Sequence, residues 1–139
     1  MVPENKMDKI KSSQEWSRQA EYDMDTAEAM LDSGRYIYCV FMCHLSIEKA
    51  LKALYVKRLG KTPSKTHNLV YLAQSTHVGM PEQTKEFLEM LDDVSVPTRY
   101  PEELEKLIRE YSKDRAKNIL DRSRAALKWL KQKLEKQQS

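Results

Sequence analysis

The chain has 139 residues, of which only three are glycine and five are proline, while 32% are charged and 40% are hydrophobic. This length is typical of one domain, so residues 1–139 are expected to form a single domain with a core over about residues 13–135. The composition excludes collagen-like and low-complexity chains, and it disfavours a β-sandwich, whose corners need more glycine and proline. The net charge of +3 does not by itself indicate a class of partner.

The sequence predicts no passage into or through a membrane. It contains no apolar run of 18 residues, and its first ten residues, MVPENKMDKI, lack the apolar segment of a secretion signal. The two cysteines, Cys39 and Cys43, lie four residues apart in a predicted helix, where a disulfide rarely forms. We therefore expect a reduced, cytoplasmic protein.

Two long helices are predicted in the first half of the chain. Residues 13–33 carry an apolar stripe at helical spacing, and Gly34 is placed to end this helix because glycine adopts the left-handed conformation at little cost. The second helix, about residues 35–59, is apolar around most of its circumference. Such a helix is covered by several neighbours.

The second half of the chain predicts shorter helices and one more long helix. Thr66 is expected to cap a third helix, and Pro81 is a favourable first residue for a fourth. Residues 95–111 are expected to form a connection with one helical turn at residues 102–108. The last helix begins at Ser112. The predicted fold is all-α, an up-and-down bundle of four to five helices with a long central second helix and a long C-terminal helix.

Charge is unevenly distributed between the terminal helices. Residues 113–139 hold nine Lys/Arg against three Asp/Glu, whereas residues 14–33 hold one Arg against six Asp/Glu. This asymmetry favours antiparallel packing of the two helices, each with a solvated charged face. A second basic run near the end of the second helix includes Lys57, Arg58, Lys61 and Lys65. It suits the negative helix end, and it supports nucleic-acid binding only weakly because no aromatic residues are interleaved with it.

His44 and Glu48 are polar residues near the middle of the apolar arc of the second helix. Being four residues apart, they can reach each other along the helix, and a buried carboxylate needs a cationic or hydrogen-bonding partner. One interpretation is a satisfied polar pair that fixes helix register. The other is a polar site at the bundle or subunit interface.

Arg99, Tyr100 and Pro101 form a second candidate site. Pro97 and Pro101 stiffen the segment, so Arg99 and Tyr100 are expected to be held extended. The guanidinium could bind phosphate or a carboxylate while the ring stacks on a base. Alternatively, Arg99 pairs with Glu48. No metal site is predicted, because Cys39, Cys43 and His44 make only a partial ligand set, and His67 is expected to support the start of the third helix.

The order and spacing of several short motifs resemble the HEPN domain family (higher eukaryotes and prokaryotes nucleotide-binding). The motifs are AEYDMDTAEAMLDSGRY from residue 20, HLSIEKALKALY from residue 44, KTHNL from residue 65, TRYP from residue 98 and YS at residue 111. The resemblance implies a helical bundle of four or five helices, a homodimer, a small nucleotidyltransferase as partner and nucleotide binding.

Many HEPN relatives are metal-independent RNases and toxins that use an Arg and a His with four to six residues between them. This chain has no His after position 77. Eight residues separate Arg35 from His44, and eight separate Arg58 from His67, so neither pair has the required spacing. We therefore expect a non-catalytic HEPN module that uses no cofactor but binds a nucleotide such as ATP or GTP, or a nucleotidyltransferase partner in a toxin–antitoxin-like pair. In it, Arg99 contacts phosphate or a partner acid, Tyr100 stacks and Glu48 positions Arg99. The alternative is an RNase toxin, or a degenerate relative of one, that uses His44 or His67.

Overall fold

The computed structural model describes residues 10–95 and 100–136 and contains six helices and no strand over those ranges. They are α2 (Ser13–Asp32), α3 (Tyr36–Leu59), α4 (Leu69–Ser75), α5 (Glu82–Ser95), α6 (Pro101–Glu110) and α7 (Lys113–Lys136). The all-α bundle with a long second helix and a long last helix is confirmed.

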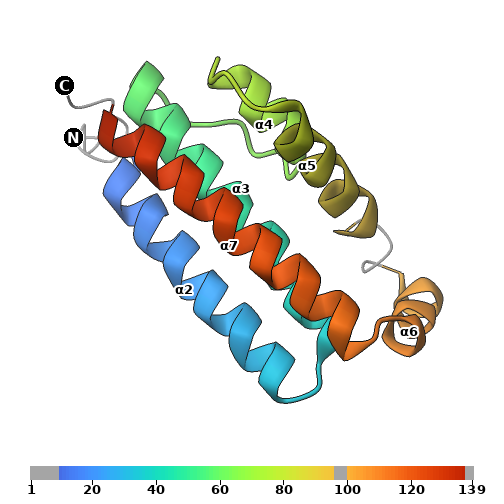
Figure 1. The fold of residues 1–139 in the computed structure, drawn as a ribbon. Helices are drawn as coiled ribbons and strands as arrows, with labels where there is room; N and C mark the ends of the chain where they lie inside the picture. Colours follow the sequence, from blue (N-terminus) through green and yellow to red (C-terminus); the bar gives the residue numbers. More distant parts are fainter. Residues whose placement is uncertain (1–9, 96–99, 137–139) are drawn as a thin grey trace, which may run out of the picture.

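The three long helices form the body of the bundle. In Figure 1, α2 and α7 lie side by side in opposite directions, with α3 behind them, and the α4–α5 hairpin packs on the other side of α3. Helix α3 contacts α2, α4, α5, α6 and α7. Its prediction as the central helix is therefore confirmed, and thirteen of its residues are buried. None of the described helices is long and apolar enough to cross a bilayer.

The ends of the first two helices follow from local chemistry. At the start of α2, the Ser12 hydroxyl accepts from the Glu15 N–H and the Glu15 carboxylate accepts from the Ser12 N–H, both at 3.1 Å. This reciprocal capping satisfies two amide groups that the helix leaves without partners. Gly34, with φ +81°, makes the turn after α2 as predicted, and Gly60, with φ +64°, ends α3 in the same way.

Three predicted boundaries in the second half of the chain were wrong. The cap of α4 is Asn68, whose side chain accepts from the Tyr71 N–H at 2.7 Å, and Thr66 accepts instead from the Asn68 N–H at 3.1 Å. Helix α5 begins at Glu82 rather than at Pro81. Pro81 precedes the helix, and its carbonyl accepts from the Lys85 N–H. The error at α4 arose because Thr and Asn are both good cap residues, and tertiary contacts chose the second one.

The third wrong boundary concerns α6, which is a ten-residue helix rather than the single turn expected within residues 95–111. It has no fully buried residue, but Leu104 and Leu107 pack against the core. A helix of this length is marginal in water by itself, so this packing supports it. The start of α7 was predicted correctly, since the Ser112 hydroxyl accepts from the Arg115 N–H at 3.1 Å.

Candidate functional site

Glu48 lies at the centre of a buried ionic network on α3. Its side chain is 5% exposed, and its two oxygens have different cationic or ring partners. Lys52 Nζ donates to Oε2 at 3.0 Å, and His67 Nδ1 lies 2.9 Å from Oε1. The expectation that Glu48 has a polar partner is confirmed. His67 was expected to support the start of the third helix, and instead it ties the connection before α4 to the middle of α3.

His44 continues this network toward α5. Its Nε2 lies 3.0 Å from Asp92 Oδ1, and its Nδ1 lies 4.0 Å from Glu48 Oε1. Asp92 also accepts from the backbone N–H groups of Leu69, at 2.9 Å, and Val70, at 3.3 Å. A carboxylate at this position satisfies amides at the start of α4 and suits the positive end of the helix. His44 therefore links α3 to the point where α4 and α5 meet.

Two residues of this network, Lys52 and Asp92, were not selected as site residues from the sequence, and His67 was named only as a support of the third helix and in the RNase alternative. Asp92 is one of several acids on α5, and nothing in its spacing distinguishes it from its neighbours. His67 does precede Asn68, the residue that caps α4. Both reach α3 only through tertiary packing.

An apolar face of α3 lies beside the network. At helical spacing it carries Tyr38, which is 39% exposed, then Phe41 and Leu45, both half-buried. Farther along the same face, beyond Lys52, Leu59 is again exposed. This face therefore combines accessible apolar surface with a buried ion pair.

The second predicted site is described only in part. Arg99 and Pro97 lie outside the described residues, so the predicted contact between Arg99 and Glu48 is not tested. Tyr100 precedes α6, where its carbonyl accepts from the Leu104 N–H at 2.8 Å and its side chain is 58% exposed. Pro101, also exposed, is the first residue of α6. The Tyr100 ring is thus available to a ligand or partner.

The predicted basic patch divides into one structural residue and three lysines at the surface. The Arg58 guanidinium donates to the Thr76 carbonyl at 2.8 Å and thereby joins the end of α3 to the end of α4. Lys57, Lys61 and Lys65 are exposed.

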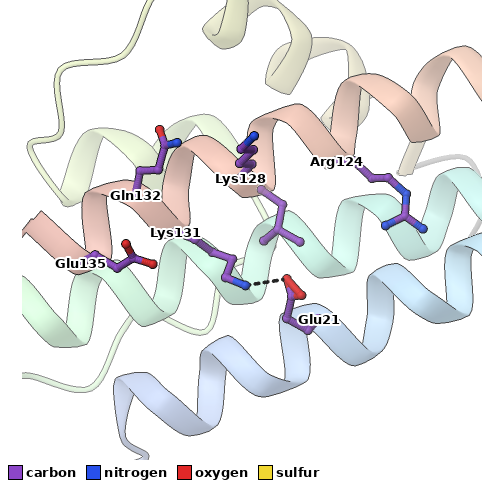
Figure 2. A pocket seen from close by; sticks show the side chains of 7 residues that line it. Glu21, Arg124, Lys128, Lys131, Gln132 and Glu135 are labelled. Atoms are coloured by element: carbon purple, nitrogen blue, oxygen red, sulfur yellow. Dashed lines mark ion pairs between the residues drawn. The ribbon is translucent and has the colours of Figure 1, made fainter.

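Helices α2 and α7 are antiparallel and joined by ion pairs, as their charges predicted. Lys131 Nζ lies 3.1 Å from Glu21 Oε1, and Arg124 pairs with Glu28. An open groove of about 370 Å³ lies along this seam (Figure 2). In Figure 2 Lys128 extends away from the Glu21–Lys131 pair, so the cations of the seam do not converge on one point.

The cysteines are packed in the core between α3 and its neighbours. Cys39 and Cys43 are fully buried free thiols. Hydrogen bonding to Cys43 and burial raise the pKa of the Cys39 thiol. Within residues 10–95 and 100–136, no three His, Cys, Asp or Glu side chains come together as metal ligands.

Comparisons with known proteins give one family. The profile of the HEPN domain matches residues 13–134. The fold is similar to the crystal structure of TT1696 from Thermus thermophilus, with a TM-score of 0.76 and 27% identity over 87% of this chain and 97% of that one. It is also similar to ST0689, described as an archaeal HEPN homologue, with a TM-score of 0.72 and 23% identity over 90% and 99% of the two chains. No curated protein sequence matches significantly.

Proposed function

The chain belongs to the HEPN domain family, and on that premise we propose that it is a non-catalytic binding module. It acts as a homodimer that binds a nucleotide, a minimal nucleotidyltransferase, or both, in a toxin–antitoxin-like pair. The observation that carries this proposal is the buried Glu48–Lys52 pair, with the exposed His67 on the same carboxylate, beside the accessible apolar face of α3. The protein acts in the cytoplasm, a reducing compartment in which its two buried cysteines stay free.

The apolar face of α3 supports the dimer. Apolar surface of α3 is exposed to water on consecutive turns, at Tyr38, Phe41 and Leu45. Burial of such surface is what drives association of identical chains. In the dimer, this face lies against its counterpart in the second copy.

Sedimentation velocity at micromolar concentration tests the dimer. The Tyr38→Glu variant places a charge on the face at an already exposed position, and it is expected to sediment as a folded monomer while the wild type sediments as a dimer. Tyr22→Glu on α2, where the ring is 73% exposed, is the matched control and should remain dimeric. A wild-type monomer, or a Tyr38→Glu dimer, contradicts this interface.

The exposed Tyr100 ring and the neighbouring Arg99 support nucleotide binding, because an aromatic ring can stack on a base while a guanidinium binds phosphate. Calorimetric titration of ATP and GTP into the wild type should give heat that Arg99→Ala and Tyr100→Ala reduce at least tenfold in affinity. Lys128→Ala, which changes an exposed lysine of α7 that is not among the predicted site residues, serves as control. If the wild type gives no heat, nucleotide binding is refuted and binding of a protein partner remains. Co-purification with a nucleotidyltransferase encoded next to this protein tests that partner.

One observation favours a second candidate, an RNase or a degenerate relative. His67 is 58% exposed while its Nδ1 lies 2.9 Å from the buried Glu48 carboxylate. A carboxylate that orients an accessible imidazole is an arrangement that general bases use. Under this alternative, purified wild type cleaves RNA and His67→Ala does not. Absence of cleavage and of growth arrest on expression removes it.

A further inference from the structure

A groove runs between α4 and α5, on a surface separate from the α3 face. Two adjacent hollows of about 200 Å³ and 510 Å³ share the lining residues Val70, Gln74 and Lys85. Because α4 and α5 are joined as a hairpin, these residues come from facing turns of the two helices. The two hollows are therefore parts of one groove.

The two ends of the groove differ in chemistry. The smaller hollow is apolar and is lined by Ala73, Val78, Met80 and Leu88. The larger hollow is acidic and is lined by Glu89, Asp92 and Asp93, together with Tyr71, which is 53% exposed. One end can hold a single aliphatic or aromatic side chain, and the other attracts a cation.

The acids at the open end differ in their availability. The Asp92 carboxylate already contacts the His44 ring and accepts from the Leu69 N–H at the start of α4. Glu89 and Asp93 are exposed, and neither carboxylate has an ion pair or hydrogen bond within the part of the chain that the structure describes. Glu89 and Asp93 therefore present two unpaired negative charges to solvent, one helical turn apart. They form an electrostatic complement for a basic partner.

We propose that the α4–α5 groove binds a basic protein segment that places one bulky apolar side chain in the Val78–Met80–Leu88 hollow and Lys or Arg side chains on Glu89 and Asp93. Lys85 lies between the two ends and fixes the direction, because its ammonium repels a cation placed near the apolar end. Leu88 at the apolar end and Asp93 at the acidic end are five residues apart on α5, a rise of about 8 Å. The cations of the segment therefore lie within about two helical turns of its anchor. This proposal does not depend on the dimer or on nucleotide binding.

Selection from a random 12-residue peptide display library on the immobilised full-length wild type tests the groove. We expect enrichment of peptides that hold Lys or Arg within about two turns of a large apolar residue. Synthetic copies should bind the wild type and lose at least tenfold in affinity for the Glu89→Lys/Asp93→Lys variant. Glu86→Lys, a charge reversal at an exposed α5 residue outside the groove, should bind as the wild type does.

A second variant tests the apolar end. Met80→Gln, in the connection between the helices, should weaken the same peptides at least fivefold while circular dichroism shows unchanged helix content. The proposal is overturned if no peptides are enriched, if the enriched peptides lack basic residues, or if they bind the double variant as tightly as the wild type. Loss of the dimer in Tyr38→Glu would not affect any of these outcomes, so the two surfaces are tested separately.

Discussion

Replacement of Glu48 by leucine should strongly destabilise the fold. The Lys52 side chain is 7% exposed, and Glu48 supplies the carboxylate 3.0 Å from its ammonium. The Glu48→Leu variant leaves that ammonium in the core without a counter-charge and removes the partner of His67. Breaking a buried pair in this way costs roughly 3–5 kcal/mol.

The same reasoning predicts that a second substitution restores most of the loss. In Glu48→Leu/Lys52→Met both charges are replaced by apolar side chains of similar volume, which is often neutral or stabilising. The double variant should therefore lie within about 1 kcal/mol of the wild type. The Lys106–Glu110 pair has the same residue types and spacing but is exposed, at 3.9 Å, so Glu110→Gln should cost less than about 0.5 kcal/mol.

Urea denaturation followed by helical circular dichroism, at one protein concentration, measures these differences. With a slope of about 2 kcal/mol/M, the Glu48→Leu midpoint should fall by about 1.5 M or more. If Glu48→Leu does not fold, Glu48→Gln still tests the network. It keeps an acceptor for Lys52 and should cost about 1–3 kcal/mol. A Glu48→Leu loss no larger than that of Glu110→Gln, or a double variant as unstable as Glu48→Leu, would refute the view that an unpaired buried charge causes the effect.

Three further predictions follow from single contacts. The hydrogen bond between the two thiols raises the pKa of Cys39 and lowers that of Cys43. Because the unfolded chain loses the Cys39 proton first, the stability that this thiol contributes is present below about pH 8.5 and falls as the pH rises above it; urea titrations on either side of this pH should show a smaller fall in Cys39→Ala than in the wild type. Asp92→Ala removes the acceptor for the first α4 amides and for His44, so it should cost about 2 kcal/mol and speed hydrogen exchange at the start of α4, whereas unchanged exchange would count against its capping role. Arg124→Ala removes only the exposed pair with Glu28 and should change the free energy of unfolding by less than about 1 kcal/mol, with a larger loss indicating that the α2–α7 seam depends on this pair.

The candidate site could be predicted from the sequence only where its residues lie on one helix. His44 and Glu48 were recognised because two polar residues interrupt an apolar arc, and Lys52 lies four residues beyond Glu48 on the same helix. The contacts of Glu48 with His67 and of His44 with Asp92 span 19 and 48 residues. Local spacing carries no information about such pairs, since they form only when separate helices pack.

The sequence by itself determined the helical class, the limits of α2 and α3, the start of α7, and the antiparallel charge pairing of the terminal helices. Periodic apolar residues, capping side chains and glycine act within a few residues, so these features need no knowledge of the fold. Tertiary structure alone decided that Asn68 rather than Thr66 caps α4, that α6 extends over ten residues, and that Asp92 joins α4 to His44. Asp92 of α5 accepts from the first amide of α4, and Leu104 and Leu107 of α6 pack against the core. These are contacts between separate helices, about which local sequence preferences carry no information.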